Sequence, residues 1–191
     1  GHPELIPPAL FIGVAERSNL IVELDRWLIT AVTRQIRAWN DDPYLAHIPV
    51  AINVSRRHLA HDHFVQHVLQ PIDNRQINPS SIIIEVTESA LLDNLADAAV
   101  KLEQLRHVGI RVAIDDFGTG YSSLSYLSSL PIDSLKIDRS FVADMHEGSK
   151  NTEIVRAIVS LGAALGKSVV AEGIETESQF AQLRDLGCEN G

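Results

Sequence analysis

Apolar segments of strand length alternate along this chain with segments of helical periodicity, and this alternation constrains the fold more than any other feature. The strand candidates lie near 48–54, 81–87, 110–115, 133–138 and 168–172. Helical segments follow them at 60–70, 91–107, 120–129, 152–166 and 177–187, and a leading amphipathic helix ends near Asn40. Repeated strand–helix units predict a parallel sheet, either closed into a barrel or open and doubly wound.

The two faces of each predicted strand favour the barrel. Successive strand residues face opposite sides of a sheet, and here one face is apolar throughout. The other face carries polar side chains, mostly near the carboxyl ends: Asn53, Glu85, Asp115, Lys136 and Glu172. An open sheet would bury these groups under helices, whereas a barrel gathers them at its active-site end.

The chain length indicates how much of such a barrel is present. An eight-stranded (β/α) barrel usually needs about 250 residues, and this chain has 191. We therefore expect an α/β fold, a (β/α)8 TIM-type barrel that lacks the first strand and the last strands. Residues 1–191 would form one partial domain, a leading helix followed by five βα units.

Composition excludes several classes of protein. Asp and Glu number 25 against 16 Lys and Arg, which argues against binding a nucleic-acid polymer. The single cysteine, Cys188, excludes an internal disulfide framework. The chain has neither a long apolar run nor a secretory signal pattern, so we expect a cytoplasmic domain, whose parent protein can still be anchored in a membrane.

Asp115 and Asp116 are adjacent carboxylates at the end of a buried strand. Neighbouring side chains diverge within a strand, so both can reach one site only where the strand ends, and Gly118 and Gly120 permit such a bend. Paired negative charges need a positive partner. An oxygen-rich group that also contains Asn53 predicts Mg²⁺ or Mn²⁺ ligands.

Two such cations about 3.5–4 Å apart suit in-line displacement at phosphorus. Lys136 would then stabilise negative charge on the phosphoryl group, and Glu172 would be the general base. Glu88 and Glu175 each lie three residues after a site glutamate. We expect these two to anchor the loop that follows Asp116.

The chain resembles the EAL-domain cyclic di-GMP phosphodiesterases over essentially its whole length. The resemblance rests on five motifs in the same order and spacing: Asn53-Val-Ser55, Glu85-Val-Thr-Glu88, Asp115-Asp-Phe-Gly-Thr-Gly-Tyr-Ser-Ser123, Leu135-Lys-Ile-Asp138 and Ala171-Glu-Gly-Ile-Glu175. It implies hydrolysis of cyclic di-GMP to linear pGpG with two Mg²⁺ or Mn²⁺ ions, with Ca²⁺ inhibitory. The Glu-Ala-Leu signature and a later glutamine of the family are expected to lie outside residues 1–191.

The resemblance also implies a role for each matching residue. Metal ligands would be Asn53, Glu85, Asp115 and Asp116. Lys136 and Glu172 would be catalytic, and Glu88 and Glu175 would stabilise the loop. The substrate loop would contain Phe117, Gly118, Thr119 and Gly120. Implied partners are cyclic di-GMP, a second copy in a homodimer, and an upstream sensor or cyclase (GGDEF) domain.

Other interpretations remain open at this point. The domain could be a catalytically inactive cyclic di-GMP receptor, although such receptors usually lose metal ligands. Asp115 and Asp116 could cap a helix that starts near Gly120. A histidine segment, His58, His61, His63 and His67, fits surface histidines better than zinc, because no cysteine or carboxylate pattern completes a site.

Overall fold

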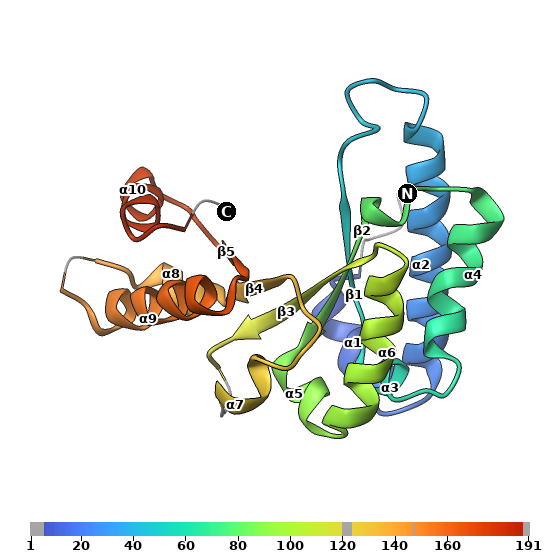
Figure 1. The fold of residues 1–191 in the computed structure, drawn as a ribbon, viewed down its shortest axis with the longest axis horizontal. Coiled ribbons are helices and arrows are strands. Elements are labelled where there is room, and N and C mark those ends of the chain that lie inside the picture. Colours follow the sequence, from blue (N-terminus) through green and yellow to red (C-terminus); the bar gives the residue numbers. More distant parts are fainter. Residues whose placement is uncertain (1–5, 120–123, 147, 189–191) are drawn as a thin grey trace. The chain divides into compact units, whose positions relative to one another are not determined.

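The fold alternates short strands with helices, as the sequence predicts. A computed structural model of the chain describes residues 6–119, 124–146 and 148–188 (Figure 1). In chain order its elements are α1 Pro8–Glu16, α2 Leu20–Trp39, β1 Val50–Asn53, α3 Arg56–Leu59, α4 Phe64–Arg75, β2 Ile82–Thr87, α5 Glu88–Leu92, α6 Leu95–His107, β3 Arg111–Phe117, α7 Leu124–Leu127, β4 Ser134–Ile137, α8 Arg139–Ala143, α9 Lys150–Leu165, β5 Ser168–Ala171 and α10 Glu177–Asp185.

The strands form one sheet in the order β1-β2-β3-β4-β5. Parallel pairing joins β3 to β4 and β4 to β5. In the second pair Leu135 lies opposite Val169 and Lys136 lies opposite Val170. Because these strands run in the same direction, their carboxyl ends lie at the same edge of the sheet.

The chain divides into two compact units. The first consists of residues 1–84 and 96–110. In this unit α2 packs against α4, α3 and β1, and Figure 1 shows α2 and α4 side by side. Its core contains Ile29, Ile52 and Phe64, which are essentially inaccessible to solvent.

Helix α2 illustrates how this unit is built. Its buried residues recur at helical spacing and make a single face: Ile21, Val22, Asp25, Ile29, Thr33 and Ile36. The buried Asp25 carboxylate accepts hydrogen bonds from the backbone N–H of Ser55 (2.9 Å) and from its hydroxyl (2.6 Å). These bonds tie α2 to the start of α3.

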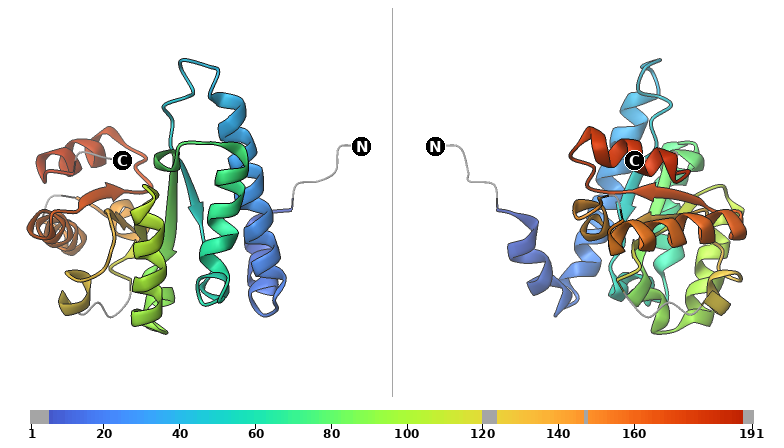
Figure 2. Two further views of the ribbon diagram at one scale, coloured as in Figure 1. Left: turned by 45° about the vertical axis from the view of Figure 1, so that its right-hand side comes forward. Right: turned by 90° about the vertical axis from the view of Figure 1, so that its left-hand side faces the viewer.

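The second unit consists of residues 85–95 and 111–191. In it α9 packs against β4, β5 and α8, and Figure 2 shows the same arrangement. Leu135, Ile137 and Val155 are completely buried in this layer. A capping box starts α10, in which Thr176 and Gln179 exchange side-chain and backbone hydrogen bonds.

Short helices account for most differences from the sequence prediction. The Pro-rich start contains α1, in which Pro8 occupies the first turn, where its fixed φ suits a helix. Helices α3 and α8 have four and five residues and begin at the side-chain caps Ser55 and Asp138. Such segments are too short to show a helical period. No helix within the described ranges is long and apolar enough to cross a membrane.

Gly162 tests the contact between α9 and β5. A Cβ atom there would overlap the Val169 side chain and lie 3.2 Å from the Lys167 carbonyl oxygen. We expect Gly162→Ala to lower the free energy of unfolding by about 1–3 kcal/mol through overpacking. Urea denaturation measures this change.

Gly13 in α1 is the matched control, because a Cβ atom there meets nothing within 4 Å. Gly13→Ala should be neutral or stabilising by roughly 0.5–1 kcal/mol, the helix preference of alanine over glycine. Equal effects of the two substitutions would contradict the packing account.

Candidate active site

A buried ammonium group surrounded by carboxylates forms the centre of the site. Lys136 Nζ lies 2.6 Å from Glu172 Oε1, 2.7 Å from Glu85 Oε2 and 3.0 Å from Asp115 Oδ1. The side chains of Glu85 and Asp115 are buried, whereas that of Glu172 is 37% exposed. The site therefore has a buried floor and one carboxylate that water can reach.

Strand alternation explains the position of Lys136. Leu135 and Ile137 on either side of it are fully buried in the apolar layer, so Lys136 must face the other side of β4. The Glu172 backbone N–H donates to the Ile137 carbonyl (3.2 Å), which extends the β4–β5 ladder by one residue. That bond holds Glu172 beside Lys136.

A β-bulge allows the two adjacent aspartates to serve one site. Ile114 lies opposite Leu135 and Phe117 lies opposite Ile137, so three steps along β3 match two steps along β4. Asp116 within the bulge has φ 53°, a left-handed conformation that is uncommon for a residue other than glycine. The chain therefore bends at Asp116 itself, inside the strand.

This geometry changes one part of the sequence prediction. The bend was expected after the strand, at Gly118 and Gly120. Gly118 does adopt φ 96°, and a Cβ atom there would come within 3.1–3.2 Å of Phe141 and Ile158. Gly120 lies outside the described residues. The sequence shows no direct signal for the bulge, because an aspartate is compatible with an ordinary strand.

The charges of the site are unbalanced. Burial raises the pKa of Glu85, and the hydrogen bond from Lys136 offsets this only in part. Burial, together with the negative charges of Asp115 and Asp138, also raises the pKa of Asp116. Burial lowers the pKa of Lys136, but hydrogen bonds to Glu172, Glu85 and Asp115 outweigh it and leave the pKa above its usual range. Lys136 is therefore a permanent cation that cannot neutralise four carboxylates.

Three of these carboxylates can share a cation. Asp115, Asp116 and Glu172 each offer an oxygen atom, and the three atoms lie within 4.8 Å of one another. All are hard oxygen donors, which match Mg²⁺ and Mn²⁺ in ligand type. The excess of negative charge and this spacing together fit divalent cations.

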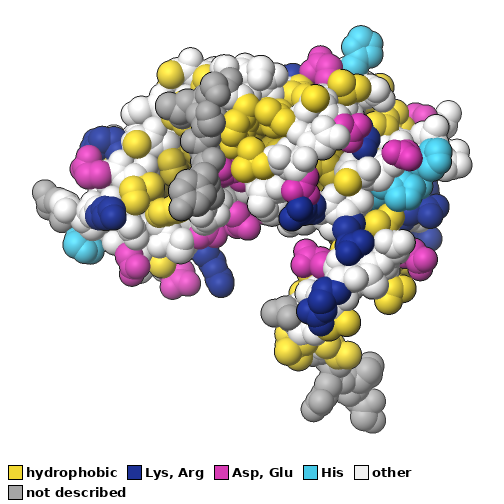
Figure 3. Space-filling view, turned by 90° about the horizontal axis from the view of Figure 1, so that it is seen from below, with side chains coloured by type: hydrophobic (Ala, Val, Ile, Leu, Met, Phe, Trp, Pro, Cys, Tyr) yellow, Lys and Arg dark blue, Asp and Glu magenta, His cyan; other side chains and the backbone are white. Residues whose placement is uncertain are grey.

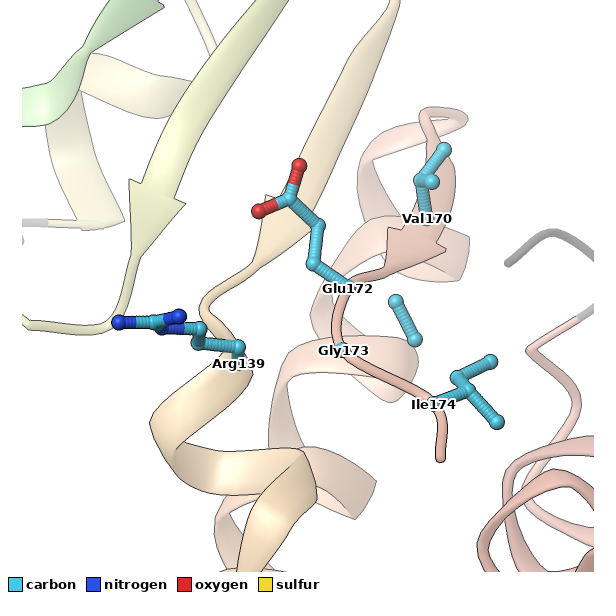
Figure 4. A pocket seen from close by; sticks show the side chains of 6 residues that line it. Arg139, Val170, Glu172, Gly173 and Ile174 are labelled. Atoms are coloured by element: carbon cyan, nitrogen blue, oxygen red, sulfur yellow. The ribbon is translucent and has the colours of Figure 1, made fainter. Parts of the chain in front are cut away.

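An open pocket of about 530 Å³ borders Glu172. Arg139, Val170, Ala171, Gly173 and Ile174 line it as well, and Figure 4 shows how these side chains lie. Gly173 has φ 71°, and a Cβ atom there would lie 2.6 Å from Arg139 Cβ. Only glycine therefore allows the turn after Glu172 to pack on the start of α8.

Glu88 contacts the helix that follows the glycine-rich segment. It is buried, and its Oε1 accepts a hydrogen bond from the Tyr126 hydroxyl at 3.2 Å. Within the glycine-rich segment the Thr119 hydroxyl donates to the Asp116 carbonyl at 2.9 Å. These bonds tie both sides of the segment to strand ends.

The roles of all the predicted site residues stay predictions, including those of the exposed Asn53 and Glu175. Asn53 is the last residue of β1 and is exposed, and it belongs to the first unit. Glu175 is exposed, and its backbone N–H donates to Gln179 Oε1 at 2.8 Å. Their roles as metal ligand and loop anchor still rest on the resemblance.

Sequence reasoning missed three residues at the site. Asp138 affects the pKa of Asp116 and caps α8 through the backbone N–H of Ser140 (3.0 Å). Arg139 is exposed and lines the pocket, and Tyr126 reaches Glu88. A signal for the first two was present, because both directly follow the strand that carries Lys136.

The chain belongs to the EAL domain family, whose model matches residues 1–191. It is 42% identical over 191 residues to the bifunctional diguanylate cyclase/cyclic di-GMP phosphodiesterase MucR of Pseudomonas aeruginosa, covering 99% of this chain and 28% of that protein. It is 42% identical over 183 residues to the cyclic di-GMP phosphodiesterase PdeR of Escherichia coli, covering 96% and 27%. The chain thus spans about a quarter of the length of these curated relatives.

A solved structure entitled PaMucR phosphodiesterase, c-di-GMP complex, has the same fold. It superposes with a TM-score of 0.91 at 42% identity, covering 96% of this chain and 80% of that one. The predicted α/β fold of the TIM-barrel type is confirmed by this likeness and by the parallel sheet.

Replacing the buried ammonium group of Lys136 should change the stability of the fold. Lys136→Met removes the ammonium group that offsets the effect of burial at Glu85, so the folded pKa of Glu85 rises further above its unfolded value. A carboxyl group with a raised folded pKa costs stability above its unfolded pKa and no longer does so below it. We expect a loss of roughly 3–5 kcal/mol at pH 7 and a smaller loss at pH 4.

Urea denaturation in EDTA at both pH values measures the two losses. Lys150→Met, at an exposed lysine, is the control and should change stability little at either pH. An equal loss from Lys136→Met at pH 7 and pH 4 would show that the ammonium charge is not what the carboxylates require.

Proposed function

We propose that this domain hydrolyses cyclic di-GMP to linear pGpG. The observation that carries the proposal is a group of four carboxylates, of which Glu85, Asp115 and Glu172 contact Lys136 and Asp116 lies beside two of these three. Membership of the EAL family and relatives named as cyclic di-GMP phosphodiesterases support the substrate class. The structure entitled a c-di-GMP complex supports the ligand.

The proposed cofactor is a pair of Mg²⁺ or Mn²⁺ ions held by Asn53, Glu85, Asp115 and Asp116. When bound, such cations activate water and neutralise charge on the phosphodiester. The donor set supports this assignment, because it is made of carboxylate and amide oxygens with excess negative charge.

Lys136 and Glu172 are the proposed catalytic residues. The Lys136 ammonium stays protonated, so it can stabilise charge that develops on the phosphoryl oxygens. Glu172 is the most exposed of the three carboxylates that contact Lys136, so it can accept a proton from an attacking water. Arg139 supplies a second cation at the adjoining pocket for a substrate phosphate.

The segment after Asp116 is the proposed substrate loop, with Phe117, Gly118, Thr119 and Gly120. Glu88 and Glu175 would stabilise it. The Glu88–Tyr126 hydrogen bond supports the first of these two roles. We further propose a cytoplasmic homodimer that forms through this loop and responds to a sensor or GGDEF domain in the same protein.

Glu172→Gln tests the catalytic proposal. The amide keeps the size of the side chain but cannot accept the proton, so we expect kcat to fall about 10²–10⁴-fold. The assay follows pGpG formation by the complete protein with Mg²⁺, and the Kd for cyclic di-GMP is measured with Ca²⁺ instead. Glu177→Gln, at an exposed residue of α10, is the control and should keep wild-type turnover.

The same assay separates the enzyme from a receptor. A wild-type protein that is folded and binds cyclic di-GMP, yet forms no pGpG at micromolar concentration, would refute hydrolysis and favour the receptor alternative. Full activity of Glu172→Gln would remove Glu172 from the mechanism.

Metal removal tests the cofactor proposal. EDTA should abolish turnover, and excess Mg²⁺ or Mn²⁺ should restore it. Asp115→Asn removes one of the shared oxygens and one negative charge, so restoration should require at least about 10-fold more Mg²⁺. Turnover that persists in EDTA, or an unchanged Mg²⁺ requirement in the variant, would contradict the assignment.

A further inference from the structure

Four histidines that have no role in the proposed catalysis gather in the first unit. They come from α3, from the following turn and from the start of α4: His58, His61, His63 and His67. Figure 3 shows neighbouring histidine side chains at the protein surface. His58 is completely buried, His67 is half-buried, and the other two are exposed.

A buried carboxylate orients this group from within. Asp25 Oδ2 lies 3.4 Å from Nδ1 of His58, a distance at which the two atoms form no hydrogen bond, but a proton on Nδ1 would face this carboxylate. With the proton on Nδ1, His58 Nε2 is an acceptor, and it lies 3.1 Å from Nδ1 of His67. In that tautomer His67 donates through Nδ1 and keeps a free electron pair on Nε2.

The same logic orients His61. Its Nδ1 accepts a hydrogen bond from the His63 backbone N–H at 3.2 Å, which leaves Nε2 for another partner. The ring centres lie 5.2 Å apart for His61 and His67, 5.8 Å for His61 and His63, and 6.3 Å for His63 and His67. Three imidazoles bound tetrahedrally to one zinc ion have ring centres roughly 5 Å apart.

We propose that His61, His63 and His67 bind one borderline transition-metal ion, with Zn²⁺ as its representative. Imidazole nitrogens suit Zn²⁺, Cu²⁺ and Ni²⁺, whereas the carboxylates around Lys136 suit Mg²⁺ and Mn²⁺. His63 is the N-cap of α4, and its ring centre lies 6.3 Å from that of His67, one turn further along. Three protein ligands leave a fourth position for water or an external ligand.

The Asp25–His58–His67 chain serves the third ligand. A carboxylate behind a histidine ligand fixes the tautomer of that histidine, and here one more histidine lies between the two groups. Asp25 is held in turn by the backbone N–H and hydroxyl of Ser55. No local carboxylate pattern completes the histidine segment, and the structure shows that Asp25 of α2 lies beside His58.

The pKa of His67 also bears on metal binding, because a proton on the ring nitrogen would compete with a metal ion. Burial, followed by the positive charges of Arg26 and the neighbouring histidines, lowers the pKa of His67 to about 4. The ring is therefore neutral at pH 7, as a metal ligand must be.

The histidine site requires the imidazole rings to turn when the ion binds. Among the described residues, the candidate ligand atoms that lie within 4.8 Å of one another in a set of three or more are those of Asp115, Asp116 and Glu172. The nitrogens of the three proposed histidine ligands do not all lie this close together. The histidine nitrogens must therefore approach one another when the ion binds. His61 and His63 are exposed and can turn about their side-chain torsions without disturbing the core.

Calorimetric titration with Zn²⁺ in excess Mg²⁺ tests the proposal on the complete protein. The Mg²⁺ occupies the acidic group, so the remaining Zn²⁺ binding reports on the histidines. We expect one Zn²⁺ per chain in the wild type, and at least about 10-fold weaker binding in His61→Ala and His63→Ala. His107→Ala, at an exposed histidine of α6, should bind as the wild type does.

Bound Co²⁺ gives a second measurement, because histidine ligation produces a visible absorption band that the two variants should lose. Both altered side chains are exposed, so the variants should fold, and circular dichroism checks this. Unchanged Zn²⁺ affinity in the His61→Ala/His63→Ala double variant would overturn the proposal. Loss of the wild-type signal when Mg²⁺ is added would do so as well, because it would place the ion at the acidic group.

Discussion

The candidate active site depends on one buried ammonium group. Lys136 contacts Glu85, Asp115 and Glu172 at hydrogen-bond distances, and without it these carboxylates would be buried against one another. The single positive charge of Lys136 cannot balance the negative charges of all these carboxylates. Asp116 adds a further carboxylate, and burial raises its pKa. The structure thus gathers more carboxylates than Lys136 can pair with where strands end. Such a group of oxygen donors suits divalent cations.

Backbone geometry builds this charge cluster. The bulge in β3 and the positive φ of Asp116 turn two adjacent carboxylates toward one position. Gly173 lets the next turn pack against Arg139, which holds Glu172 at the end of β5. An uncommon backbone conformation at a non-glycine residue persists only when the surrounding structure enforces it. Here the buried strands and α9 provide that support.

The two polar groups of the molecule differ in how they use burial. Around Lys136, burial raises carboxyl pKa values and creates a demand for hard cations. Around His67, burial lowers a histidine pKa and leaves a neutral nitrogen ligand. Desolvation disfavours the charged form in both groups. It therefore raises the pKa of a carboxyl group, which is charged when deprotonated, and lowers the pKa of a histidine, which is charged when protonated.

Much of the candidate site could be predicted from the sequence. Strand alternation alone placed Glu85, Asp115, Lys136 and Glu172 on the same face of the sheet, because successive side chains of a strand point to opposite faces. The structure brings these four together. The helices α3 and α8 and the helical start at Pro8 were missed, since short helices are set by caps and not by periodicity.

The sequence by itself determined the alternation of strands and helices, the apolar and polar faces, and the types of ligand, because these follow from local periodicity and side-chain chemistry. Only the tertiary structure decided where β3 bulges, which carboxylates contact Lys136, and that Asp25 stands behind His58. Those features join residues that are far apart in the chain, or hold a residue in a backbone conformation that its type adopts only when the surroundings enforce it. Packing makes that choice, and no local pattern records it.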